Sequence, residues 1–211
     1  MEPNKGMLDV MLPAYRPCLN FGICKEAVWK PEVGHIPRGF FGATGALSEV
    51  QLIMIFAEPG HTYGEEEYDP NSDAMNLLMH GVRHTYSCFE SGRDQFHRNT
   101  RWFLDRVFPQ MSFDEQLKHV WMTEGRLCSV AKEIGGFKDR TCSSHYLGKQ
   151  IELLPNATVV AFGGKAQDYM KSIRSDWIRA YALSPPGANH RPARPSWEAA
   201  IEAIWTRQER G

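Results

Sequence analysis

A carboxylate that could do acid–base chemistry follows an apolar segment in the first third of the chain. Residues 51–57 are mostly Leu, Ile, Met and Phe, and Glu58, Pro59 and Gly60 come directly after them. An apolar run without alternation is typical of a parallel strand that is buried on both faces. Ligands bind beyond the carboxyl ends of such strands, so Glu58 is the first candidate for a catalytic residue. A solvated acidic loop after a core strand is the alternative.

Three other segments also carry polar or glycine-rich residues at a predicted strand end. They are Thr123-Glu124-Gly125-Arg126, Phe162-Gly163-Gly164-Lys165 and Leu183-Ser184-Pro185-Pro186-Gly187. If the strands are parallel, these ends meet at one edge of the sheet.

The elements that must position these residues alternate along the chain. Strands are predicted over 51–57, 119–122, 157–162 and 179–183, and helices over 74–89, 100–108, 144–154, 165–173 and 196–207, with a further helix capped by Ser112 and Glu115. Ser196 is the expected N-cap of the last helix. This order predicts an α/β fold, a three-layer α/β/α sandwich with a short, mainly parallel four-stranded sheet. We expect one domain over 1–211, with 1–48 as an irregular lead-in packed on it.

Composition narrows the class of protein. The 211 residues carry a formal net charge of −1, which excludes nucleic-acid binding by bulk charge but leaves room for a local basic patch. Arginines crowd the C-terminal part. Without a signal sequence or an apolar run of membrane-spanning length, we expect a soluble, cytoplasmic monomer that does not bind a membrane. The five cysteines are an odd number and argue against a disulfide framework, so free core thiols or metal ligands remain.

In order and spacing, the motifs resemble those of the uracil-DNA glycosylase superfamily, and most closely its bacterial and archaeal iron–sulfur branches. The resemblance covers roughly residues 15–205 and rests on five segments. These are Pro37-Arg38-Gly39-Phe40-Phe41-Gly42, Phe56-Ala57-Glu58-Pro59-Gly60, Ser91-Gly92-Arg93-Asp94-Gln95-Phe96, residues 154–166 (L-P-N-A-T-V-V-A-F-G-G-K-A) and Ala182-Leu183-Ser184-Pro185.

The resemblance implies a monofunctional glycosylase that flips a nucleotide out of DNA and hydrolyses its N-glycosidic bond in base excision repair. Glu58 would then stabilise the cationic sugar and orient or deprotonate the attacking water. The histidine that stabilises the departing base in the family corresponds to Ala182. His61 and His190 are the possible substitutes, and His61 is our second candidate catalytic residue.

Base recognition is also implied by the resemblance. Ala57, Gly60, Phe96 and Glu124 would contact the base, with Phe96 stacking on it. Glu124 replaces an asparagine that reads the base edge, so it would need a raised pKa to donate as well as accept a hydrogen bond. Without such a shift, the preferred base is not uracil or backbone groups read it. Glu124 could also pair with Arg126 outside the pocket. For Phe96, a core residue is the alternative.

The C-terminal loop would contact the DNA partner through phosphate groups or insertion into the duplex. Its candidate residues are Ser184, Gly187, Asn189, His190, Arg191 and Arg194, and a solvated basic loop is the alternative. A 4Fe-4S cluster would be bound by Cys18, Cys24, Cys128 and Cys142, although Cys18 and Cys24 are spaced more widely than in the family. Buried free thiols are the alternative for these cysteines, and Cys88 would be a core thiol.

The sequence therefore predicts excision of uracil from DNA. Excision of another deaminated base such as hypoxanthine, or a catalytically silent nucleic-acid-binding relative, remains open.

Overall fold

The computed structural model describes residues 2–60, 62, 64–130 and 139–209. Its strands are β1 (Phe41–Gly42), β2 (Leu52–Phe56), β3 (Val120–Glu124), β4 (Thr158–Phe162) and β5 (Ile178–Ala180). Its α-helices are α1 (Lys5–Met11), α2 (Ala74–Ser91), α3 (Gln95–Val107), α4 (Phe113–His119), α5 (Gly148–Glu152), α6 (Gly164–Met170) and α7 (Ala193–Gln208). A π-helix, Ser143–Leu147, runs directly into α5.

The strands form one sheet in the order β1-β3-β2-β4-β5. The pairs β2–β3, β2–β4 and β4–β5 are parallel, and β1 pairs with β3 in the antiparallel direction. The predicted α/β class with a mainly parallel sheet is confirmed, but the sheet has five strands, not four. The fifth strand, β1, is only two residues long, and so short a segment has no periodicity that a sequence reading can detect.

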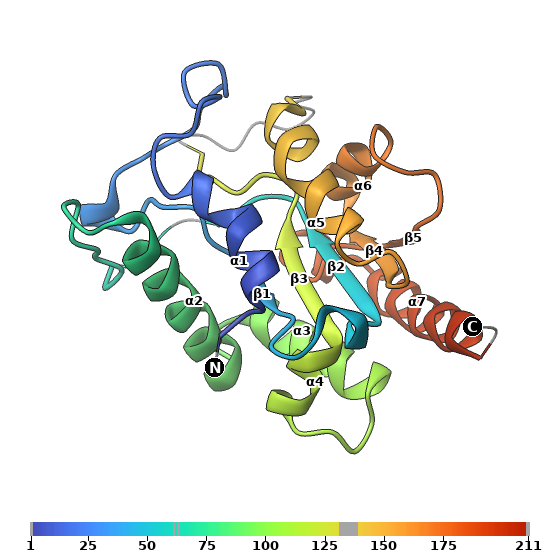
Figure 1. The fold of residues 1–211 in the computed structure, drawn as a ribbon. Coiled ribbons are helices and arrows are strands. Elements are labelled where there is room, and N and C mark those ends of the chain that lie inside the picture. The colour runs from blue at the N-terminus through green and yellow to red at the C-terminus, as the bar shows by residue number, and fades with distance from the viewer. Residues whose placement is uncertain (1, 61, 63, 131–138, 210–211) are drawn as a thin grey trace.

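Helices cover both faces of the sheet (Figure 1). Figure 1 shows α1 and α5, which contact each other, in front of the sheet, and α3 and α7, which also contact each other, behind it. All five residues of each of β2, β3 and β4 are buried, in agreement with their mostly apolar sequences. The core therefore lies on both sides of the three central strands.

Side-chain caps fix the starts of three helices. The Asp73 carboxylate accepts a hydrogen bond from the Asn76 amide at α2, and Asp94 accepts one from the His97 amide at α3. At α4, Ser112 and Glu115 form the predicted capping box, in which Glu115 accepts from the Ser112 amide at 2.7 Å. The Asp94 cap begins α3 five residues before the predicted start, which places Phe96 in its first turn.

Two further predictions differ from the structure. The lead-in is not wholly irregular, because Asn4 caps α1 by accepting from the Gly6 amide. Ser196 does not cap the last helix, since α7 already begins at Ala193. The Ser196 hydroxyl instead accepts a hydrogen bond from the Tyr181 amide at 2.9 Å and so ties α7 to the chain after β5.

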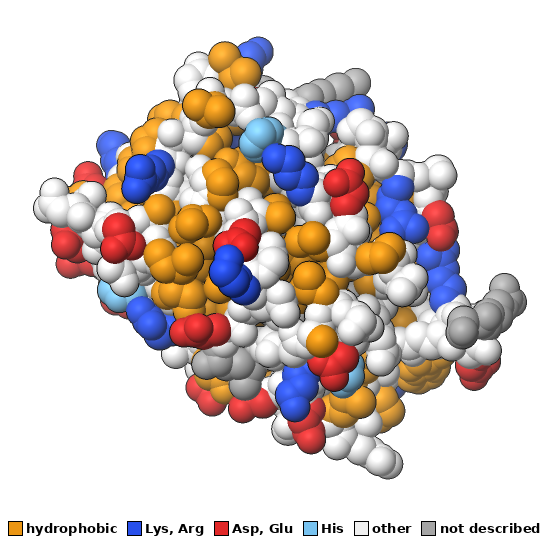
Figure 2. All heavy atoms as spheres, viewed as in Figure 1, with side chains coloured by type: hydrophobic (Ala, Val, Ile, Leu, Met, Phe, Trp, Pro, Cys, Tyr) orange, Lys and Arg blue, Asp and Glu red, His pale blue; other side chains and the backbone are white. Residues whose placement is uncertain are grey.

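On the face shown in Figure 2, acidic and basic side chains are interspersed with apolar ones. Among the described residues, no helix combines the length and the apolar composition that crossing a bilayer requires.

Candidate active site

The parallel register brings the predicted strand ends together. Phe56 of β2 lies opposite Glu124 of β3, and Ile55 lies opposite Ala161 of β4. Beyond the strands, the Gly125 amide donates to the Phe56 carbonyl at 2.8 Å, and the Arg126 amide donates to the Ala57 carbonyl at 3.1 Å. The chain after β2 therefore runs between those after β3 and β4, as the convergence argument predicts.

A cavity of about 750 Å³ opens at this edge of the sheet. Its walls come from the ends of β2, β3 and β4, from α2 and α3, and from the loop after β5. Of the predicted site residues, it is lined by Ala57, Glu58, Gly60, Phe96, Glu124, Ser184 and Gly187. This is the size and placement expected of a ligand pocket in an α/β protein.

Glu58 is held by a lysine at the start of α6. The Lys165 Nζ donates to the Glu58 Oε1 at 2.6 Å, and the two side chains are 24% and 11% exposed, respectively. The contact follows from the register, because continuing β2 and β4 past their last pair sets Glu58 beside the Gly164 and Lys165 positions. Glu58 is thus a partly buried, ion-paired carboxylate inside the pocket, and a freely solvated loop is ruled out for this residue.

Glu124 is a deeply buried acid in the pocket wall. It is 4% exposed, and its Oε2 has no hydrogen-bond partner among the described residues. Burial, with repulsion from Glu58, raises the pKa of Glu124 well above its usual range, although Arg38 opposes the shift. Burial thus favours the protonated form of Glu124, which can both donate and accept a hydrogen bond. Arg126 donates instead to the Lys25 carbonyl.

Gly39 gives Glu124 its space. The φ angle of Gly39 is +84°, and a Cβ built there would lie 2.7 Å from the Glu124 Oε1. A side chain would be strained by this conformation and would collide with the carboxyl group. This close approach explains why the lead-in segment carries a glycine directly after Arg38.

Phe96 lies between the core and the cavity. Its ring contacts that of Phe56 edge to face, with centroids 4.9 Å apart, and it also packs on Phe89 and His97. The side chain is only partly buried and lines the pocket, so packing and stacking on a ligand are compatible. Burial lowers the pKa of His97, in spite of its contact with Asp94 at 2.8 Å.

A buried charge network stiffens the wall opposite Lys165. The Arg38 guanidinium donates to the Glu66 carboxylate at 2.6 Å, to the Gly34 carbonyl at 3.1 Å and to the Gly60 carbonyl. His84 lies 3.4 Å from both Glu66 and the Cys88 Sγ, and contacts with Cys88 and then Glu66 raise its pKa to about 9. Through Gly60, this network fixes the loop that carries Glu58.

The loop after β5 closes the pocket on the side of α3. Gln95 donates to the Asn189 side-chain oxygen at 2.8 Å, and Asn99 donates to the Leu183 carbonyl at 2.8 Å. Ser184 and Gly187 line the pocket, while His190 and Arg191 are exposed. Arg194 lies over the Trp102 ring at 3.2 Å and near Glu198, away from the pocket-lining set.

His61 and His190 were the candidates to replace the missing histidine at Ala182. His61 lies outside the described residues. His190 is exposed and stacks near Tyr181, with ring centroids 6.3 Å apart, and it is not among the pocket-lining residues. Ala182 does line the pocket; a Cβ added to Gly163 or Gly187 would lie 3.0 or 2.8 Å from its methyl group.

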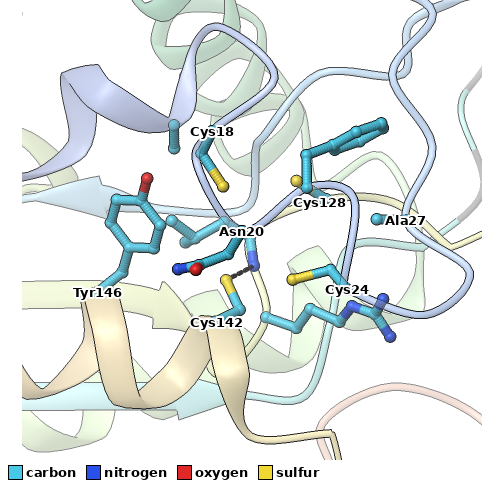
Figure 3. Close-up of a pocket in the computed structure, with 11 residues that line it drawn as sticks. Cys18, Asn20, Cys24, Ala27, Cys128, Cys142 and Tyr146 are labelled. Carbon is cyan, nitrogen blue, oxygen red and sulfur yellow. Dashed lines mark hydrogen bonds between the residues drawn. The ribbon is translucent and has the colours of Figure 1, made fainter.

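Four of the five cysteines line a second, smaller pocket (Figure 3). Cys18 and Cys24 come from the loop after α1, Cys128 follows β3, and Cys142 immediately precedes the π-helix. The loops are joined by the hydrogen bond from the Val28 amide to the Ser129 carbonyl at 3.0 Å. The Leu127 amide donates to the Cys142 sulfur at 3.4 Å, drawn as a dashed line in Figure 3. The structure thus brings together the cysteines that the resemblance grouped.

In the described part of the chain these thiols are not arranged around a single ion. Burial raises the pKa of Cys128 and that of Cys142, the latter to about 12, and so favours their neutral thiol form. Among the described residues, no three His, Cys, Asp or Glu side chains form a group that could hold one metal ion. A 4Fe-4S cluster binds each thiolate through a different iron, so its ligands lie further apart than those of one ion. Cys88 is buried elsewhere, against His84.

The sequence alone did not predict several residues that line the pocket, namely Arg38, Glu66, His84, His97 and Lys165. The position of Lys165 could have been predicted, because it follows a strand end parallel to that of Glu58. Arg38 and Glu66 are 28 residues apart, and nothing in their local sequences indicates that they pair.

Comparison with known proteins gives no family for this chain. No protein-family model matches it, and no curated protein matches it significantly.

Proposed function

We propose that the protein is a DNA glycosylase that hydrolyses the N-glycosidic bond of a deaminated nucleotide flipped into the 750 Å³ pocket, with uracil as the principal base. The observation that carries the proposal is the meeting of Glu58, Glu124 and Phe96 in one cavity at the carboxyl edge of the sheet. A carboxylate, a base-reading group and an aromatic ring are what such a reaction needs. The motif resemblance supports the same reaction.

Glu58 supplies the chemistry. As the bond between C1′ and the base breaks, its electron pair leaves with the base, and the sugar becomes an oxocarbenium-like cation. The Glu58 carboxylate stabilises that cation and accepts a proton from the water that attacks C1′. The proton passes to solvent or to the departed base, which completes the hydrolysis.

Glu124 reads the base edge in its neutral form. Its hydroxyl donates to a base carbonyl and its carbonyl oxygen accepts from the adjacent ring N–H. Uracil presents this pair at O4 and N3, and hypoxanthine presents it at O6 and N1. The buried, unpartnered Oε2 of Glu124 therefore supports uracil and also favours hypoxanthine as a second substrate.

We further propose that Cys18, Cys24, Cys128 and Cys142 bind a 4Fe-4S cluster with a structural function. Bound iron would supply the positive charge that the buried thiolates lack, and would fasten the loop after α1 to the chain after β3. The four sulfurs lining one pocket support this assignment.

The test is incubation with duplex and single-stranded oligonucleotides that each contain one uracil, hypoxanthine, xanthine or mismatched thymine, followed by alkaline cleavage of abasic sites. We expect cleavage at uracil, with hypoxanthine second. DNA binding without cleavage of any of these oligonucleotides would instead identify a catalytically silent binder and would overturn the proposal.

A further inference from the structure

The charge beside the reacting carboxylate is the starting point. Lys165 reaches Glu58 from α6, and both side chains are mostly shielded from water in the same pocket. Where water is largely excluded, a fixed charge acts on its neighbours far more strongly than at a surface. A cation so close to Glu58 must therefore influence any bond that breaks beside that carboxylate.

The bond-breaking step separates two opposite charges. The sugar gains positive charge and the departing base gains negative charge. A site lowers the barrier by matching this pattern in advance, with an anion on the sugar side and a cation on the base side. Glu58 and Lys165 supply one charge of each sign in this pocket, with 2.6 Å between the Lys165 Nζ and the Glu58 Oε1.

Arg38 also lines this cavity, but it is differently engaged. Arg38 is held by Glu66 and by the carbonyls of Gly34 and Gly60, so its guanidinium supports the loop. Ala182, at the end of β5, offers only a methyl group. Lys165 is the cation that contacts the proposed catalytic carboxylate itself.

We propose that Lys165 is a catalytic residue whose ammonium group stabilises the negative charge on the departing base. This inference rests on the proposed function and extends it. The ammonium keeps its three protons and acts by charge and hydrogen bonding, while the base leaves with the electron pair of the C1′–N bond. The Glu58 contact fixes the amine on its flexible stem before the substrate binds, so little reorganisation is needed during the reaction.

A leaving-group comparison separates this role from simple positioning of Glu58. Fluorine at the 5-position of uracil withdraws electrons, so 5-fluorouracil departs as a more stable anion and depends less on an external cation. Single-turnover excision rates are measured for uracil and 5-fluorouracil in the same oligonucleotide. The proteins are the wild type, Lys165→Met, Lys165→Gln and Lys165→Arg, with Lys171→Met as the matched control. Lys171 is an exposed lysine just after α6, bound to Asp168 at 3.1 Å.

We expect Lys165→Met and Lys165→Gln to lose roughly 10²-fold in uracil excision and much less in 5-fluorouracil excision. Lys165→Arg should retain most of both rates, and Lys171→Met should match the wild type. Unfolding curves check that the variants are folded, and Lys165→Gln replaces Lys165→Met if the latter is not. Equal losses on the two bases, or no loss, would overturn the role of Lys165 and leave the glycosylase proposal standing. A wild type that excises neither base would overturn both.

Discussion

The two pockets of this molecule meet at the end of β3 but are built on opposite principles. Glu124, the last residue of β3, lines the large cavity, and Cys128, four residues later, lines the small one. The large cavity holds acids and bases already paired with each other, such as Glu58 with Lys165 and Arg38 with Glu66. The small pocket gathers four cysteine thiols, and burial raises the pKa of Cys128 and that of Cys142.

The two pockets therefore differ in how their charges are balanced. Charges in the large cavity compensate one another, so the protein alone can hold its geometry. The thiol pocket is assembled from loops distant in sequence, and loops of this kind are commonly held together by a metal or a cluster. Substitutions in each pocket can test this difference.

The largest effect is expected from cysteine replacement in the small pocket. Cys142→Ser should lose nearly all bound iron, since a hydroxyl is a poor ligand for a cluster that needs four thiolates. Cys88→Ser is the matched control, because Cys88 is buried but faces His84, and it should keep its iron. Iron content and visible absorbance of anaerobically purified protein are the measurements. An iron-free, colourless wild type would contradict the prediction.

In the large cavity, Arg38→Met should destabilise the fold by about 3–5 kcal/mol, because the buried Glu66 carboxylate then loses the guanidinium that lies 2.6 Å from it. Replacing Glu66 by Leu as well should recover much of the loss. Arg174→Met, which removes a partly exposed partner 3.8 Å from the exposed Asp176, should change stability by less than about 1 kcal/mol. Urea unfolding at neutral pH measures all three, and equal effects of Arg38→Met and Arg174→Met would refute the buried network.

Glu124→Gln probes the neutral acid. The folded-state pKa of Glu124 is raised, so between its ordinary and raised values the folded state binds more protons than the unfolded state. The free energy of unfolding therefore falls as pH rises through that window. The folding equilibrium constant decreases by at most about tenfold per pH unit. Glu124→Gln should remove this fall and also any alkaline loss of excision, whereas the exposed Glu152→Gln should not. Identical pH profiles for the wild type and Glu124→Gln would contradict a protonated Glu124.

The smallest effect, on DNA binding, is expected from a substitution in the exposed loop after β5. Arg191→Ala should weaken DNA binding by several-fold and lower the salt slope of binding by about 0.9. Arg207→Ala, in the last turn of α7 and paired with Asp176 at 2.6 Å, is the comparison and should leave both unchanged. Binding titrations at several salt concentrations measure this, and an unaltered slope would remove Arg191 from the interface.

The features of the fold and the site that could be predicted are those that a short stretch of sequence encodes. Apolar runs located β2, β3 and β4, and their parallel order placed Glu58 and Glu124 at one edge. The Ser112 capping box was visible in four residues. By contrast, β1 was too short for a pattern, and α3 began earlier than expected because Asp94 caps it. The contacts of Lys165 with Glu58 and of Arg38 with Glu66 exist only once the chain is folded.

We propose that Glu58 performs the hydrolysis in the large cavity. Single-turnover excision of uracil by Glu58→Gln tests it most directly, with DNA affinity measured in parallel and the exposed Glu67→Gln as the control. We expect Glu58→Gln to lose roughly 10²–10⁴-fold in excision rate while its DNA affinity stays within a few-fold of the wild type. Glu67→Gln should lose nothing. Undiminished excision by Glu58→Gln would contradict it.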